Sequence, residues 1–168
     1  MIFKLYTTSL ENLNLKDGFN GDEACRPAMP AGRQAGEAGA FCAFEGRVRN
    51  HSDGRKVIAL EYEALDPLCQ KEAGKIFQEV GKKFNVLNVT CCHRVGKLSV
   101  GEMAVWVGVS ASHRDDAFKA CRYIIDEIKA RLPIWKKEFY ADGDSGWVNG
   151  QNNVAEQHAM PHSIPRPS

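Results

Sequence analysis

Basic side chains gather where the sequence pattern predicts that strands or helices begin or end. Arginine offers forked donors and lysine a mobile point charge, so such a set suits a phosphate or a carboxylate ligand. Each group also has an ordinary explanation, such as solvation of a sheet face or the attraction of a helix C-terminus for cations. The groups are Arg47 with Arg49, His113 with Arg114, Lys129 with Arg131, and Lys136 with Lys137.

The first two groups have local contexts that favour anion binding. Arg47 and Arg49 are two residues apart in a predicted strand, so both side chains point to one face. His113 and Arg114 stand at the start of a helical pattern, and the free N–H groups of a helix N-terminus attract anions. A single anion site that joins all the groups is therefore one hypothesis. Independent solvated groups are the alternative.

Other kinds of site have little support. The six cysteines form no C-x-x-C pair, and most lie in apolar patterns, where cysteine behaves as a small hydrophobe. Cys91-Cys92-His93 resembles a metal-binding sequence, but neighbouring strand residues point to opposite faces and no second pair has zinc spacing. No local signature marks a cysteine–histidine nucleophile. We therefore expect no metal and no disulfides.

Size and charge exclude several classes of protein. The 168 residues suffice for one domain. The 22 basic and 21 acidic side chains give a net charge of +1, which argues against wholesale binding of nucleic acid. No apolar run reaches the roughly 18 residues of a membrane span, and the N-terminus carries no signal-peptide pattern. These features predict a reduced, cytoplasmic protein without a membrane segment.

Apolar runs predict the strands that must position these groups. In one strand, Ile58, Leu60 and Tyr62 are expected on the same face. Residues 49–54 are expected to form a turn, from their Asn, Ser, Asp and Gly. Residues 1–20 are interpreted as a strand followed by a short helix. The strand that holds Ile58 is predicted at 56–64, and the others at 40–48, 86–95, 103–109 and 134–140.

Two helices are predicted from apolar residues at helical spacing. Asp66 is expected to cap the first, with Pro67 at its first position. Ser112 and Asp115 form a capping-box pattern for the second, which Pro133 should end. The first apolar stripe comprises Cys69, Ala73, Ile76, Phe77, Val80 and Phe84, and the second Ala117, Phe118, Cys121, Ile124, Ile125, Ile128 and Leu132.

The order of these elements predicts a single α+β domain over residues 1–148, with helices packed against a largely antiparallel sheet. Residues 21–39 are rich in Gly, Ala and Pro and are interpreted as a loop insertion. Residues 149–168 hold few large apolar groups and are predicted to form a disordered tail.

Several segments, taken in order, resemble the large subunit of molybdopterin synthase, the MoaE family. The resemblance covers roughly residues 38–148. Its most specific part is Pro-Ile-Trp-Lys-Lys-Glu, with a further lysine seven residues before the first lysine of that segment. The matching segments are Phe44-Glu-Gly-Arg-Val-Arg-Asn50, Leu60-Glu-Tyr-Glu-Ala64, His93-Arg-Val-Gly96 with Gly101-Glu102, Ser112-His-Arg114, and Lys129 with Pro133–Glu138.

The resemblance implies an α/β-hammerhead fold with an additional antiparallel β subdomain. It implies a sulfurtransferase that needs no cofactor and converts cyclic pyranopterin monophosphate into the dithiolene of molybdopterin. The sulfur would come from the C-terminal Gly-Gly thiocarboxylate of a small ubiquitin-like subunit. Two large subunits would form a homodimer with one small subunit at each end, a heterotetramer overall.

The same resemblance assigns roles to residues of this sequence. Lys129 and Lys136 fall on the family's active-site lysines. The substrate-binding positions fall on Arg47, Val48, Arg49, His113, Arg114, Lys129, Lys136, Lys137 and Glu138. The sequence departs from the family at residues 21–39 and lacks the basic residues often found after Trp147.

Two mechanisms remain open for Lys129 at this stage. It would either activate the acyl-thio group as a nucleophile or neutralise it electrostatically. A non-catalytic adaptor for a ubiquitin-like partner, and a pterin or nucleotide-phosphate binding protein, are the alternative functions. An adaptor has no need of two lysines together with two separate arginine groups, so their joint presence favours the enzyme.

Overall fold

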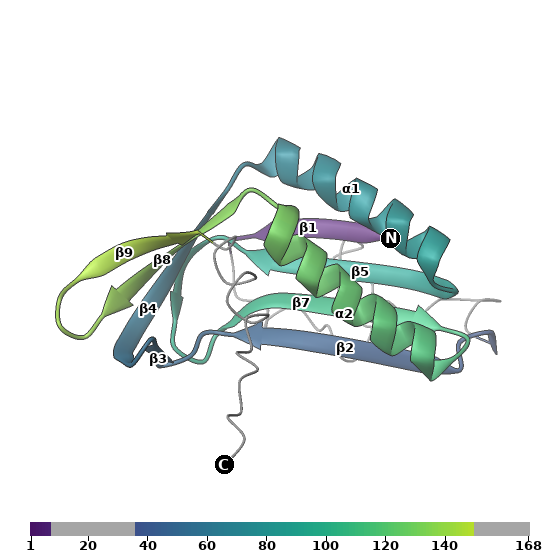
Figure 1. The fold of residues 1–168 in the computed structure, drawn as a ribbon, viewed down its shortest axis with the longest axis horizontal. Helices are drawn as coiled ribbons and strands as arrows, with labels where there is room; N and C mark the ends of the chain where they lie inside the picture. Colours follow the sequence, from purple (N-terminus) through teal and green to yellow (C-terminus); the bar gives the residue numbers. More distant parts are fainter. Residues whose placement is uncertain (8–35, 150–168) are drawn as a thin grey trace, which may run out of the picture.

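The computed structural model describes residues 1–7 and 36–149. Figure 1 shows that these residues form two sheets, with two helices laid over one face of the first sheet. The elements are β1 (Ile2–Tyr6), β2 (Ala40–Arg47), β3 (His51–Ser52), β4 (Arg55–Ala64), α1 (Asp66–Lys83), β5 (Val86–Arg94), β6 (Gly96–Ser99), β7 (Met103–Ala111), α2 (Arg114–Arg131), β8 (Ile134–Tyr140) and β9 (Ser145–Asn149).

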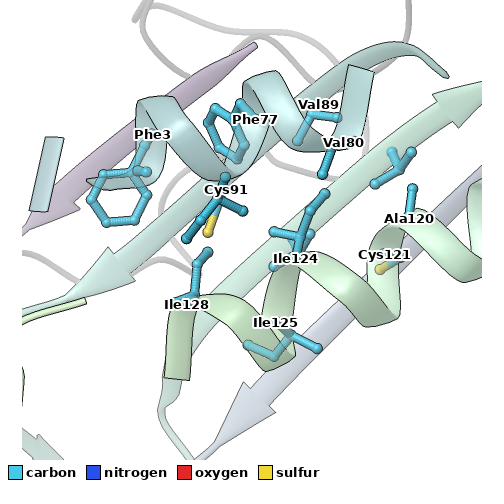
Figure 2. Close-up of a cluster of buried hydrophobic side chains, with 14 of the residues drawn as sticks. Phe3, Phe77, Val80, Val89, Cys91, Ala120, Cys121, Ile124, Ile125 and Ile128 are labelled. Carbon is cyan, nitrogen blue, oxygen red and sulfur yellow. The ribbon is translucent and has the colours of Figure 1, made fainter. Parts of the chain in front are cut away.

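The first sheet has four strands in the order β1-β5-β7-β2. β1 pairs with β5 in parallel, and the other pairs are antiparallel. Its main hydrophobic core lies between the sheet and the two helices, as Figure 2 shows. Val105, Val107 and Val109 of β7 all enter this core, as their alternation in the sequence predicts.

The second sheet extends from one end of the first (Figure 1). Its strand order is β3-β4-β8-β9, with β6 paired to β4, and every pair is antiparallel. The α+β class and the additional antiparallel sheet are therefore as expected. β6 and β9 were not predicted from the sequence. The remaining strand predictions agree with the structure to within a few residues at each end.

The helix bodies were predicted correctly, but their caps were not. The N-cap residues are Leu65 for α1 and His113 for α2, and neither forms a side-chain capping bond. Asp66 lies inside the first turn of α1 and accepts a hydrogen bond from Gln70 at 3.0 Å. The capping box expected from Ser112 does not form, because the helix begins one residue later than that pattern requires.

Two predicted core residues are exposed. Ile58 is 53% exposed, because the β4–β8 register shifts between Val57 and Ala59 and turns this side chain away from buried Leu60. Phe118 of α2 is 61% exposed, whereas its stripe neighbours Ala117 and Cys121 are buried. Alternation and helical spacing predict which face of an element is buried. They do not predict the effect of a β-bulge, or the exposure of a residue at the edge of the apolar stripe.

The chain reverses direction over fewer residues than the turn expected at 49–54. His51 and Ser52 form a short strand against β4, and the chain reverses at Asp53 and Gly54, which have positive φ angles of 48° and 76°. Glycine adopts such angles without steric cost, and aspartate tolerates them better than most residues.

Cysteine and membrane expectations can be tested over part of the chain. Among the described residues no cysteine forms a disulfide, and no helix is long and apolar enough to cross a membrane. The short helix expected after β1, the insertion at 21–39 up to residue 35, and the tail from residue 150 lie outside the described residues.

Candidate active site

Several of the predicted site residues lie at one end of the first sheet. There β2 and β5 finish, α2 ends, and the second sheet begins (Figure 1). We call this region the junction. It holds Arg47 at the end of β2, Lys129 in the last turn of α2, and Lys136 near the start of β8. Segments that are far apart in the sequence therefore bring cations to the same end of the fold.

Arg47 is fixed by neighbouring backbone. The β2–β7 register shifts between Gly46 and Arg47, and the guanidinium donates to the carbonyl oxygen of Gly101 at 2.9 Å. It also pairs with Glu45 at 3.0 Å. These bonds tie the end of β2 to the turn before β7 and give the guanidinium a defined direction.

Val48 anchors the two arginines. Its side chain is buried in a small core with Leu60 and Leu98. Its N–H donates to the Glu102 carbonyl at 3.0 Å, and its own carbonyl accepts from Gly101 at 2.8 Å. Both backbone polar groups are thus occupied, so Val48 holds Arg47 and Arg49 in place. Arg49 itself is exposed.

Lys136 belongs to a buried polar chain on the inner face of β8. Its Nζ lies 2.8 Å from Oε1 of Glu138, and the Tyr140 hydroxyl donates to Oε2 of the same carboxylate at 2.5 Å. Burial works to raise the pKa of Glu138, but the hydrogen bonds from Lys136 and Tyr140 outweigh it and the pKa is lowered. The carboxylate therefore stays charged and orients Lys136.

Lys137 points to the opposite face from Lys136, because successive strand residues alternate. It stands opposite Trp147 of β9, with its Nζ 5.7 Å from that ring centre and 5.2 Å from that of Phe139. The two lysines expected as one group are therefore separated by the thickness of the sheet.

His113 and Arg114 are far from the junction within one chain. They stand at the N-terminal end of α2, and Lys129 lies fifteen residues after Arg114, in the last turn. At 1.5 Å per residue, the helix separates Arg114 from Lys129 by about 22 Å. One copy of the chain cannot join all four basic groups in a single small-molecule site.

Arg131 was grouped with Lys129 in the sequence, but its partners in the structure are carboxylates of the two helices. Its guanidinium contacts Glu72 and Glu79 of α1 and Glu127 of α2, at 2.5, 2.8 and 3.1 Å. This cluster joins the two helices. Arg131 therefore has a structural place, whereas Lys129, two residues earlier, is exposed and forms no ion pair with the described residues.

Sequence reasoning missed two residues at the junction, of which His93 is buried and Tyr62 is half-buried. His93 of β5 and Tyr62 of β4 meet edge to face, with ring centres 5.0 Å apart. Tyr62 stands opposite Lys136 on β8. Burial, with a smaller contribution from the charge of Lys129, lowers the pKa of His93 to about 4. The signal for His93 was the segment His93-Arg-Val-Gly96, which carries part of the family resemblance without an assigned role.

The junction carries cations on three elements, and such a set can bind and orient an anion. No group of three His, Cys, Asp or Glu side chains suited to a metal occurs in the described part of the chain. Cys91 and Cys92 are both buried on opposite faces of β5, which agrees with the interpretation of that sequence as structural.

Comparisons with known proteins agree with this picture. The profile of the family described as MoaE protein matches residues 22–131. The molybdopterin synthase catalytic subunit of Thermoplasma volcanium is 46% identical over 66% of this chain and 81% of its own length. That of Synechococcus elongatus is 48% identical over 67% and 68% of the two chains.

Solved structures show the same fold. Molybdopterin synthase from Staphylococcus aureus gives a TM-score of 0.63 at 39% identity, covering 67% of this chain and 81% of that chain. A molybdopterin biosynthesis MoaE protein from Burkholderia ambifaria gives 0.65 at 28% identity, with 95% and 99% covered. A complex of subunits 1 and 2 of molybdopterin-converting factor from Helicobacter pylori gives 0.64 at 20% identity, which supports the fold alone.

Proposed function

This chain belongs to the MoaE family and is a catalytic subunit of molybdopterin synthase, and from that premise we propose that its junction is the sulfur-transfer site. Lys129 and Lys136 act on the reacting groups, and Arg47 and Arg49 hold the phosphate of cyclic pyranopterin monophosphate. The sulfur arrives as the C-terminal Gly-Gly thiocarboxylate of a small ubiquitin-like subunit.

The observation that carries the proposal is that the end of α2, the start of β8 and the end of β2 lie at one end of the fold (Figure 1). These segments hold Lys129, Lys136 and Arg47. A phosphorylated pterin and a thiocarboxylate are both anions, so they repel each other in free solution. Cations fixed on three separate elements remove that repulsion and orient the two reactants. Orientation of bound reactants contributes several kcal/mol to catalysis, on the order of 7 or more in favourable cases.

The position of Arg114 supports a homodimer. Because α2 holds His113 and Arg114 about 22 Å from Lys129, these residues reach a junction only if it belongs to a second copy. Exposed Phe118 and Phe41 lie near the same end of the sheet and helix, where apolar surface favours association. Each active site would then combine Lys129 and Lys136 of one copy with His113 and Arg114 of the other, and one small subunit per site gives a heterotetramer.

The test is turnover by the Lys129→Ala enzyme with the pterin precursor and a thiocarboxylated small subunit. This variant should fold and bind the small subunit, because one exposed side chain is a small part of a protein interface. It should form little or no molybdopterin. Lys71→Ala, which removes an exposed lysine from α1, is the matched control and should retain full activity.

Lys129→Arg separates the two mechanisms. Guanidinium keeps the charge but does not lose its proton, so an arginine that restores turnover assigns an electrostatic role to Lys129. Continued loss of turnover supports a nucleophilic role. Normal turnover in Lys129→Ala would reject the site assignment and favour an adaptor that only binds the small subunit.

A further inference from the structure

The turn between β6 and β7 lies against the end of β2, and we call its residues, 99–102, the support turn. The Glu102 N–H donates to the Ser99 carbonyl oxygen at 3.2 Å, and this bond closes the turn. Gly101 has a φ angle of 90°, which glycine adopts without steric cost. The turn therefore has a defined shape, and both polar groups of the Gly101 backbone point out of it.

Three hydrogen bonds connect the support turn to the end of β2 and the residue after it. The Val48 N–H donates to the Glu102 carbonyl oxygen at 3.0 Å, and the Gly101 N–H donates to the Val48 carbonyl oxygen at 2.8 Å. The Arg47 guanidinium donates to the Gly101 carbonyl oxygen at 2.9 Å. The direction of Arg47 and the backbone that leads to Arg49 therefore depend on the shape of this turn.

The side chain of Glu102 fixes the support turn from within. Its Oε2 accepts a hydrogen bond from the Ser99 N–H at 2.5 Å, and its Oε1 lies 3.4 Å from Nη1 of Arg94. One carboxylate thus connects the first residue of the turn to the last residue of β5. Hydrogen bonds to an ionised group are stronger than those between neutral groups, so this carboxylate restricts the conformations open to the turn.

Arg94 is a buried cation at the place where the two sheets meet. Its side chain is 7% exposed, and its Nη2 donates to the carbonyl oxygen of Lys97, in β6, at 3.4 Å. Within the described part of the chain, Glu102 is the only carboxylate that pairs with it, and its Nε–H has no hydrogen-bond partner. Loss of the Glu102 charge would leave this buried cation uncompensated.

We propose that Glu102, paired with Arg94, is a positioning residue for the phosphate site. Its carboxylate fixes the support turn, and the turn holds Arg47 and Arg49 in the orientation that binds the precursor. This inference rests on the proposed role of the two arginines in holding the phosphate. It also gives a role to Arg94 and Glu102, which belong to segments of the family resemblance that had none.

Positioning of this kind acts on affinity. A segment that already has its binding conformation binds more tightly, because no ordering of the chain opposes binding. The Arg49 side chain is exposed and has no partner among the described residues, so only its backbone is held in advance. A looser support turn should therefore weaken binding of the precursor and change the chemical step much less.

Glu102→Gln tests the proposal with almost no change in side-chain size. The amide oxygen can still accept from the Ser99 N–H, but the charge opposite Arg94 is lost. Calorimetric titration of the full chain with the phosphorylated precursor should show a dissociation constant about five- to ten-fold higher. In the reconstituted enzyme KM for the precursor should rise by a similar factor, while kcat at saturating precursor stays nearly unchanged.

Asp142→Asn is the matched control. The Asp142 carboxylate also accepts from an arginine, Arg55 at 2.8 Å, and from a backbone N–H, that of Asp144 at 3.1 Å. It lies in the turn between β8 and β9 instead of the support turn, so its loss should leave affinity and KM unchanged. Equal affinities of Asp142→Asn and Glu102→Gln would overturn the proposal.

Amide hydrogen exchange of the full chain gives a second measurement that needs no ligand. In Glu102→Gln the N–H groups of Val48 and Gly101 should exchange faster, because the bonds between the turn and β2 open more often. The N–H of Val107, at the centre of β7, should keep its protection. Unchanged exchange at Val48 would also overturn the proposal.

A double variant tests the pairing with Arg94. Arg94→Met combined with Glu102→Gln should raise the dissociation constant no more than the larger of the two single effects, because the two side chains act as one pair. Additive effects would show that Arg94 acts independently of Glu102 and would reject that part of the proposal.

The two levels of inference fail in different ways. If Arg49→Ala binds the precursor normally, the phosphate site is wrong, although exchange at Val48 still reports whether Glu102 holds the end of β2. If Arg49→Ala weakens binding but Glu102→Gln behaves like Asp142→Asn, the phosphate site stands and the positioning role of Glu102 is rejected.

Discussion

Arg49 differs from Arg47 in having no partner within the described residues. Arg47 is held by Gly101 and Glu45, whereas Arg49 is exposed and forms no hydrogen bond or ion pair with the residues of known position. A cation that stabilises nothing in its own fold is available to a ligand. Its loss should therefore affect binding far more than folding.

Arg49→Ala should weaken binding of the phosphorylated precursor about ten- to a hundred-fold, the loss expected for one charge-assisted hydrogen bond. Its melting temperature should stay close to that of the parent chain. Calorimetric titration with the precursor measures the first and thermal unfolding the second. Arg122→Ala removes an exposed arginine from α2 and should bind normally. Equal affinities in the two variants would remove Arg49 from the site.

Glu138 acts through Lys136. Its buried carboxylate accepts from both Lys136 and Tyr140, and its charge keeps the lysine ammonium against the inner face of β8. Glutamine has almost the same size but no charge, so Glu138→Gln tests the electrostatic role without leaving a cavity.

Glu138→Gln should lower turnover about ten-fold, because Lys136 loses the charged partner that orients it. Glu61→Gln is the matched control. Glu61 stands opposite Lys137 on the other face of the same strand pair, so its loss should leave turnover nearly unchanged. Steady-state assays of the two variants measure this difference in turnover. Equal activity would mean that the buried ion pair is structural only.

The two helices are joined by an ion-pair cluster around Arg131. Glu79 of α1 accepts from Arg131 and from the Tyr123 hydroxyl, and these hydrogen bonds, Arg131 first, lower its pKa to about 2. A lowered folded-state pKa contributes stability above the unfolded value near 4.5, and this contribution is lost as the pH falls toward 2. The cluster therefore stabilises the helix layer at neutral pH.

Arg131→Met should lower the melting temperature at pH 7 by a few degrees. The difference from the parent chain should shrink as the pH falls from about 4.5 to about 2, because the parent loses the same interaction by protonation of Glu79. Melting curves across this range measure it. Arg122→Met, on an exposed position of the same helix, should show no such trend. A constant difference at every pH would assign the effect to packing.

The length of α2 determines which residues of one chain can reach the same site. The helix holds Arg114 and Lys129 at its two ends, about 22 Å apart. In the proposed homodimer the two junctions are related by symmetry, and each takes one end of α2 from each copy. In a mixed dimer, one chain would lack the Lys129 side chain and the other would lack the Arg114 side chain. Both losses would then fall in the same active site, and the second active site would keep all of its residues.

Mixing Lys129→Ala chains with Arg114→Ala chains should therefore restore activity. With random pairing, half of the dimers are mixed and each has one intact site, so turnover should approach about a quarter of the parent value. Co-expression with two affinity tags, followed by an assay with the thiocarboxylated small subunit, measures this. Activity no greater than that of the separate variants would show that both residues serve one chain or that the dimer does not form.

The sequence determined the family, both helices and most of the strands. The helical stripes that include Ile76 and Ile124, the alternation of Val105, Val107 and Val109, and the stop at Pro133 all reflect local periodicity, which side-chain burial imposes on neighbouring residues. The ordered motifs that end in Pro133–Glu138 identified the family. Local patterns could not place Ile58, because the β4–β8 bulge depends on pairing with a strand more than seventy residues later.

Only the tertiary structure decided where the predicted site residues lie relative to one another. It brings Lys129 and Lys136 to the junction with Arg47, and it sends Lys137 to the other face and Arg131 to Glu79. It also places His93 and Tyr62, from different sheets, in contact. These relations depend on how two sheets and two helices pack, and packing joins residues through contacts that have no period in the sequence.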